Sequence, residues 1–300
     1  MRRFFKWVGV VVAAGLLALG GLFAVAWAVT GSAMTRTYAI NDPPLVVDRD
    51  ADTLAHGHHL FDTRGCGDCH GPAGEGKVLI DEPGLIRVVP SNLSRALRNP
   101  AYTDKAIAAA IRHGVRPDGT PLVIMPAGDY AELDDRDVAA LVTYLRSLPA
   151  SNNDPGATAV GPIARVMYVL GKFPLLPAET VDHAPRERQA PPEAVSVDYG
   201  RYVAQSCTGC HGPDFAGGLV VEPGKPASAN LTPHATGLAG WTESDFLRAM
   251  HTGRRPDGRQ LDPLMPWATY SRMREVELRA IWTYLATLEP TPSRGAPAAR

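Results

Sequence analysis

At 300 residues, the chain is long enough for two domains of about 100–150 residues each. Its formal net charge of −1 lacks the strong basic excess that marks a nucleic-acid-binding protein, so no nucleic-acid partner is expected. The four cysteines fall into two closely spaced pairs. A disulfide across so short a gap constrains an unfolded chain little, so structural stapling is a poor explanation for them.

The amino terminus predicts a membrane anchor over residues 1–32. A basic head, residues 1–6, precedes residues 7–29, which contain no ionisable side chain. A secretory signal has an apolar region of roughly 7–15 residues, whereas a spanning helix needs about 20. The alternative is cleavage after the small-residue run 26–28, which would release a soluble protein. Basic residues before the span place the head in the cytoplasm and the rest in the periplasm, outside a bacterial inner membrane crossed once.

After the span, the second half of the chain repeats the first. The matched segments, in the same order in both copies, are Cys66–Pro72 with Cys207–Pro213, Glu82–Gly84 with Glu222–Gly224, Asn92–Ser94 with Asn230–Thr232, Arg116–Gly119 with Arg255–Gly258, Met125–Pro126 with Met265–Pro266, and Thr143–Leu145 with Thr283–Leu285. The repeat predicts two domains, 46–150 and 196–290, joined by a Pro-rich linker, 151–195. The tail, 291–300, is expected to be disordered.

Each copy is expected to be all-α, because no convincing alternating strand pattern occurs. A short helix before each cysteine pair is followed by a helix over 103–113, capped by Thr103, and by another over 134–148. Thr242 is the matching cap in the second copy. The linker holds one apolar stretch, Ile163 to Phe173, which predicts a short helix that either packs on a domain or touches membrane or a partner.

Each cysteine pair is followed at once by histidine, as Cys66-x-x-Cys69-His70 and again from Cys207 to His211. Two thiols at this spacing can add to the vinyl groups of haem while the imidazole binds its iron. Zinc ribbons place their two pairs about 15–20 residues apart, but well over a hundred residues separate these. A thioredoxin-like pair is expected beside a βαβ pattern, which is absent. The motifs therefore predict two covalently bound haem c groups, held through Cys66, Cys69, Cys207 and Cys210.

The iron ligands are predicted from the repeat. His70 and His211 bind one face of each iron, and the ligand on the other face must occur in both copies. Met125 and Met265 do so, each before a proline. Met250 and Met273 match Ile111 and Leu133 and are predicted to be core residues. His113 and His251 match Thr252 and Arg112, so both are interpreted as ordinary surface or helix residues, with a bis-histidine variant in one site left open.

Groups around the haem are predicted from the same matches. An iron-bound imidazole usually donates its second N–H to an acceptor, for which the carbonyls of Pro83 and Pro223 are the candidates. Further candidates, for hydrogen bonds to the haem propionates, are Tyr102, Trp241, Arg116 and Arg255. The two Arg-Pro-Asp-Gly segments are also expected to form tight turns.

These motifs resemble the cytochrome c superfamily. The second copy, with Asn230-Leu231-Thr232-Pro233 and Leu264-Met265-Pro266, resembles the cytochrome subunits of membrane-bound alcohol dehydrogenases, which commonly carry three haem motifs where this chain has two. The resemblance implies two cytochrome c domains in tandem behind a transmembrane helix. It also implies electron transfer from a dehydrogenase or quinol-linked donor to a respiratory acceptor such as a terminal oxidase. The alternative is a dihaem enzyme, a peroxidase or a sulfur-compound dehydrogenase; a haem-based sensor is disfavoured because no output domain is present.

Overall fold

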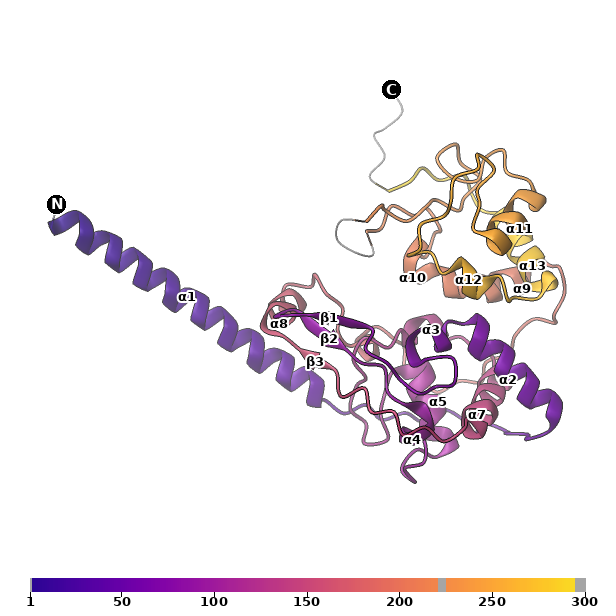
Figure 1. The fold of residues 1–300 in the computed structure, drawn as a ribbon, viewed down its shortest axis with the longest axis horizontal. Coiled ribbons are helices and arrows are strands. Elements are labelled where there is room, and N and C mark those ends of the chain that lie inside the picture. The colour runs from indigo at the N-terminus through magenta and orange to yellow at the C-terminus, as the bar shows by residue number, and fades with distance from the viewer. Residues whose placement is uncertain (1, 221–224, 295–300) are drawn as a thin grey trace.

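The computed structural model describes residues 2–220 and 225–294. One long helix, α1 (Arg2–Thr35), extends away from two helical lobes that pack against each other (Figure 1). Its segment Arg3–Thr35 is long and apolar enough to cross a membrane. The expected anchor thus corresponds to a single uninterrupted helix.

The first lobe is built around two helices in close contact, α2 and α7. Its helices are α2 (Ala51–Thr63), α3 (Cys66–His70), α4 (Leu93–Ala96), α5 (Asp104–His113), α6 (Ala127–Tyr130) and α7 (Asp135–Ser147). A buried apolar cluster that includes Phe61, Ile107 and Val138 fills the lobe. The helix α2 comes so close to α7 that a Cβ on Gly57 would lie 2.0 Å from the carbonyl oxygen of Ala140.

The second lobe repeats this arrangement. Its helices are α9 (Val197–Val203), η2 (Ala204–Cys207), α10 (Thr208–His211), α11 (Glu243–Thr252), α12 (Trp267–Tyr270) and α13 (Glu275–Leu285). A Cβ on Gly200 would lie 1.9 Å from the carbonyl oxygen of Ala280, as at Gly57. The predicted caps are confirmed, because Thr103 accepts from the N–H of Ala106, and Thr242 forms a capping box with Asp245. Because Gly57 and Gly200 make the same contact in their lobes, the residues around them can be matched one to one.

A small antiparallel sheet was not expected from the sequence. Its strands are β1 (Ile80–Glu82), β2 (Ile86–Val88) and β3 (Ala159–Val160), in that order. Ile80 pairs with Val88, and Ile86 pairs with Val160. Strands of two or three residues are too short to show an alternating pattern, so the fold is mostly helical, as predicted, with this one addition.

The linker folds onto the first lobe. It holds β3, the helix α8 (Pro162–Val169) and a 3₁₀ turn, η1 (Pro177–Glu179). The predicted apolar helix thus exists as α8, which packs against the end of α1 in an apolar cluster containing Ala33, Ala164 and Leu175. This packing agrees with the first of the two alternatives for the segment, while contact with the membrane stays a prediction.

A buried polar cluster that includes His113 holds the linker to the first lobe. This side chain is completely buried; its Nε2 lies 2.9 Å from Asp42 Oδ2, and its Nδ1 lies 2.9 Å from His183 Nδ1. Arg188 donates to the same oxygen of Asp42 at 2.9 Å. His113 is the last residue of α5, so of the two possibilities, surface or helix, the second is found, and its burial could not be predicted because its neighbours come from distant segments. His251 is exposed, as expected.

Two reciprocal contacts join the lobes. His59 on α2 binds Glu277 on α13, with 2.7 Å between Nε2 and Oε2. Tyr202 on α9 donates to Asp137 on α7. His59 and Tyr202 both stand two residues after the close-contact glycine, and Asp137 and Glu277 both stand three residues before the alanine that it meets. The lobes therefore meet through an approximate twofold arrangement.

The first residues of the expected disordered tail are bound to the second lobe, which corrects that expectation. Thr291 accepts from Asn230 at 2.7 Å, and Arg294 donates to the carbonyl of Gly217 at 3.0 Å. Residues 295–300 of the tail lie outside the described residues.

Candidate haem sites

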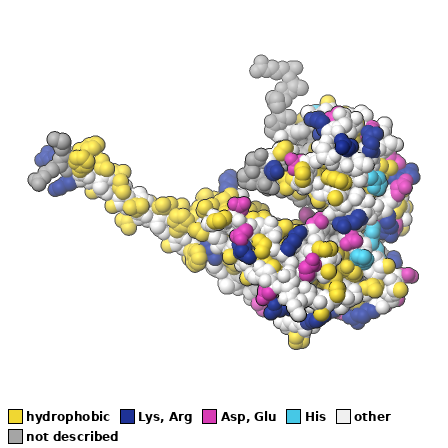
Figure 2. Space-filling view, viewed as in Figure 1, with side chains coloured by type: hydrophobic (Ala, Val, Ile, Leu, Met, Phe, Trp, Pro, Cys, Tyr) yellow, Lys and Arg dark blue, Asp and Glu magenta, His cyan; other side chains and the backbone are white. Residues whose placement is uncertain are grey.

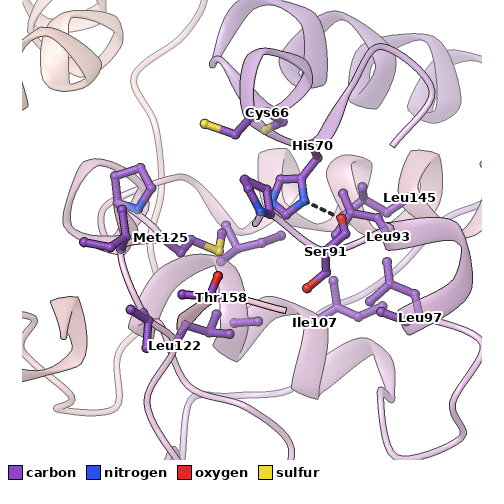
Figure 3. A pocket seen from close by; sticks show the side chains of 18 of the residues that line it. Cys66, His70, Ser91, Leu93, Leu97, Ile107, Leu122, Met125, Leu145 and Thr158 are labelled. Atoms are coloured by element: carbon purple, nitrogen blue, oxygen red, sulfur yellow. Dashed lines mark hydrogen bonds between the residues drawn. The ribbon is translucent and has the colours of Figure 1, made fainter. Parts of the chain in front are cut away.

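The first site lies under α3, where the CxxCH segment forms a short helix between two glycines. Gly65 and Gly71, at φ 77° and 85°, take the left-handed conformations that turn the chain into and out of this helix. Cys66, Cys69 and His70 line one cavity, which holds about 1300 Å³ of space including its mouth. Met125 points into the same cavity (Figure 3). The two thiols, the imidazole and the thioether predicted for this site are thus brought together.

The second site repeats the first with a smaller cavity. Cys207, Cys210, His211 and Met265 line about 540 Å³ of space. The two other methionines of the cavity wall, Met250 and Met273, are buried in the apolar core of the lobe, as predicted. Both sites combine their polar donors with mostly apolar walls, which suits a large planar ring with iron at its centre.

Both histidines point one ring nitrogen at a main-chain carbonyl. Nδ1 of His70 lies 2.8 Å from the carbonyl oxygen of Ser91 (Figure 3), and Nδ1 of His211 lies 2.7 Å from that of Ala229. Because a carbonyl only accepts, Nδ1 carries the proton and Nε2 is left with its lone pair for a metal. Burial lowers the pKa of both imidazoles, which also favours this neutral form.

The expected acceptor in the first site was therefore wrong. Pro83 lies exposed in the turn between β1 and β2, and His70 uses Ser91 instead. Pro223 lies outside the described residues, while His211 uses Ala229. Ser91 and Ala229 each stand just before the repeated Asn-Leu pair, which is the sequence signal that marks this position.

The asparagines of that pair hold the carbonyl-bearing loops in place. Asn92 donates from Nδ2 to the carbonyls of Ser151 and Asn153, at 3.0 and 2.9 Å. Asn230 does the same to Thr291 in the second lobe. Both side chains are buried. The repeat marks these asparagines in the sequence but indicates no role for them. In the structure, each ties its loop to the segment that follows the last helix of its lobe.

The four thiols line the two cavities without forming a disulfide or a zinc site. All four are free. Burial raises the pKa of Cys66 to about 12 and that of Cys207 to about 11, so both are neutral thiols. In the part of the chain that the structure describes, no three His, Cys, Asp or Glu side chains are grouped to hold a metal ion. The residues present therefore fit haem c, and not a zinc ion.

The candidates for hydrogen bonds to the haem propionates are placed differently in the two lobes. Tyr102 and Arg116 line the first cavity, and Arg116 also donates to the carbonyl of Pro121. Their counterparts are not among the residues lining the second cavity. Trp241 packs against the apolar core of its lobe, and Arg255 Nε lies 3.8 Å from Asp257 Oδ2. The propionate contacts thus stay predictions, supported by the geometry of the first lobe alone.

At the interface, each CxxCH turn lies against the other lobe. Asp68, between the first pair of cysteines, accepts from Thr269 on α12 at 2.5 Å. Gly209 holds the equivalent place in the second motif, and a Cβ there would lie 2.9 Å from Oδ2 of Asp129 on α6. Burial raises the pKa of Asp129 to about 6. No sequence pattern indicates these contacts, because they join residues far apart in the chain.

Comparison with known proteins agrees with this geometry. The family profile for cytochrome c matches residues 54–149 and 197–289. The cytochrome c subunit of a quinone alcohol dehydrogenase of Gluconacetobacter polyoxogenes is 32% identical over 129 residues, which are 40% of this chain and 26% of that protein. The fructose dehydrogenase cytochrome subunit of Gluconobacter japonicus is 33% identical over 102 residues, 31% of this chain and 21% of that protein. The chain thus spans only about a quarter of the length of these relatives.

A further relative has nearly the same extent as this chain. A protein described as diheme cytochrome c-type, from Cereibacter sphaeroides, is 26% identical over 281 residues, 82% of this chain and 88% of that protein. The family match covers both lobes, and each lobe contains one complete CxxCH site. The cofactors are two covalently bound haem c groups, and the chain belongs to the cytochrome c family.

Proposed function

We propose that this chain is a membrane-anchored electron carrier without a substrate of its own. It relays electrons between a dehydrogenase or quinol-linked donor and a respiratory acceptor such as a terminal oxidase. The haem groups supply reversible one-electron oxidation and reduction of iron when bound. The protein's part is to attach them, set their ligands and hold them close enough for transfer.

The observation that carries this proposal is that one histidine and one methionine from matching positions of the repeat line each cavity. His70 with Met125, and His211 with Met265, are the proposed pairs of iron ligands, and each pair lines a single cavity. An iron with both axial positions filled has no open position for peroxide or a sulfur compound. Methionine ligation also raises the haem potential, which suits an acceptor of electrons from a dehydrogenase.

The interface supports transfer between the two haems. The Asp68–Thr269 hydrogen bond and the approach of Asp129 to Gly209 put each attachment turn against the other lobe. Haem groups attached to Cys69 and Cys210 in these turns would thus be held next to the interface, which would shorten the path between them. The proposed functional units are the two domains 46–150 and 196–290, held together by the interface as well as by the linker.

The helix α1 supports a place in the bacterial cytoplasmic membrane, crossed once, with both haem domains in the periplasm. Its basic head precedes the apolar span, which is the arrangement of a segment with its amino terminus inside. The relatives named as cytochrome subunits of alcohol and fructose dehydrogenases support a dehydrogenase as the donor.

A redox titration of the purified full-length protein, followed by optical spectra, tests this proposal. We expect two one-electron transitions, no binding of carbon monoxide to the reduced protein, and no turnover of hydrogen peroxide. Carbon monoxide binding at one haem of the native protein, together with peroxide turnover, would instead identify a dihaem enzyme.

A further inference from the structure

The helix α8 is short and leaves large apolar side chains in contact with water. Ile163 near its start is 50% exposed, and Leu170 just after its end is 60% exposed. The opposite side is covered, because Ala164 is completely buried in the apolar cluster that α8 shares with α1. The described chain thus covers neither of the two large apolar side chains at the ends of this helix.

The position of α8 beside α1 indicates what covers these side chains. The guanidinium of Arg165 lies 3.9 Å from the centre of the Trp27 ring, so α8 lies level with the last turns of the apolar span. Trp27 is itself 59% exposed. Tryptophan near the end of a span and a basic group beside it are typical of the boundary between lipid headgroups and acyl chains. In Figure 2 the apolar surface of α1 continues onto this end of the first lobe.

From this continuity we propose that α8 lies in the headgroup–acyl boundary of the membrane that α1 spans, with Ile163 and Leu170 in its apolar layer. The inference rests on the membrane anchor of the proposed function. It commits to lipid rather than to a second protein, because the surface adjoins the span directly. Lys172, exposed two residues after Leu170, is placed to reach the lipid phosphates.

Contact between α8 and lipid would also order the two haems relative to the membrane. The turn between β1 and β2 is bound to the start of α8: the N–H of Gly161 donates to Leu85 at 2.8 Å, and that of Ile163 donates to Gly84 at 3.1 Å. Val88, at the end of β2, lines the first haem cavity. The sheet thus connects the lipid-facing helix to the wall of the first site, which makes the first haem the one nearer to the membrane.

Thiol labelling of the full-length haem protein in lipid nanodiscs tests this inference. The native cysteines are consumed by the thioether bonds, so a single introduced cysteine is the only reactive thiol. Leu170→Cys and Ile163→Cys are compared with Leu17→Cys, in the middle of the span, and with Val195→Cys, which is 45% exposed just before α9. The probe is a water-soluble maleimide, which reacts with the thiolate and therefore reacts slowly with a thiol in lipid.

We expect Leu170→Cys and Ile163→Cys to react at least about tenfold more slowly than Val195→Cys, because lipid suppresses thiolate formation. Their labelling should become complete when the protein is denatured. If both react as fast as Val195→Cys while Leu17→Cys stays protected, the anchor stands and lipid contact by α8 is refuted. If Leu17→Cys is also labelled rapidly, the membrane anchor itself fails, and this inference fails with it.

Discussion

Nε2 of His59 in the first lobe donates a hydrogen bond to Oε2 of Glu277 in the second lobe, across 2.7 Å. Glu277 is almost completely buried, and its other oxygen lies 3.9 Å from Nη2 of Arg64. Burial opposes ionisation, but the hydrogen bond to His59 and the charge of Arg64 outweigh it and lower the pKa of Glu277 from 4.5 to about 2. The interface is therefore held by a buried carboxylate that stays ionised.

Glu277→Gln is expected to destabilise the protein and to change how its stability depends on pH. A carboxylate with a lowered pKa stabilises the folded state above about pH 4.5, and this contribution is lost as the pH falls towards 2. We expect a loss of about 3 kcal/mol in the free energy of unfolding at pH 7, because Arg64 and His59 are left without their carboxylate. The acid-dependent part of the stability should shrink.

Urea unfolding at pH 7 and at pH 4 measures both effects. The matched control is Glu243→Gln, which removes a surface carboxylate lying 2.9 Å from Arg279. It should change the free energy of unfolding by less than about 1 kcal/mol. Equal effects of the two substitutions would show that the buried contact does not hold the lobes together.

Gly57→Ala is expected to prevent α2 from packing on α7. The added Cβ would lie 2.0 Å from a main-chain oxygen of Ala140, which cannot turn away as a side chain can. We expect a loss of about 3 kcal/mol or more, seen as a lowered melting temperature by circular dichroism. Gly128→Ala is the control, because a Cβ there meets nothing within 4 Å. Similar melting temperatures for the two variants would contradict the close helix contact.

Met265→Leu is expected to remove one axial ligand. The weak absorption band of methionine bound to ferric haem should fall to one-haem intensity, the potential of the second haem should drop, and carbon monoxide should bind there. Met273→Leu changes a methionine in the wall of the same cavity that is only 4% exposed, and it should leave the band intact. An unchanged spectrum of Met265→Leu would show that the ligand is misassigned.

Asn92→Ala is expected to loosen the loop that carries the Ser91 carbonyl. The substitution removes two buried hydrogen bonds, to Ser151 and Asn153, and we expect it to cost about 2 kcal/mol. The potential of the first haem should also shift, because the acceptor that orients His70 is no longer fixed. Asn99→Ala, at an exposed position, is the control. A destabilised protein with an unchanged potential would limit Asn92 to a structural role.

The parts of the site that are formed by side chains could be predicted from the sequence, whereas the part formed by the main chain could not. The thiols, His70 and Met125 are side chains of distinctive chemistry that recur in both repeats, so spacing alone grouped them correctly. The acceptor for His70 is a carbonyl, which every residue has, and no side chain marks it. The carbonyl of Ser91 is selected by the path of the loop, which depends on Asn92 and on residues about 60 positions later.

The fold shows the same division. The helices over 103–113 and 134–148 follow from local periodicity and caps, and the structure has them as α5 and α7. The burial of His113 depends on Asp42 and His183, each about 70 positions away. The helix α8 was foreseen from its apolar run, but its docking against α1 was not, because that contact is made by small residues such as Ala164.

The contacts that join the lobes also bear on the evolutionary origin of the tandem chain. His59 contacts Glu277, and Tyr202, the equivalent of His59, contacts Asp137, the equivalent of Glu277. Each lobe therefore contributes the same part of its surface to the interface. Such self-complementary pairing is the mark of an isologous homodimer. The tandem chain therefore has the organisation expected if a single-haem ancestor first dimerised and its gene was then duplicated and fused, leaving each half free to acquire a different redox role.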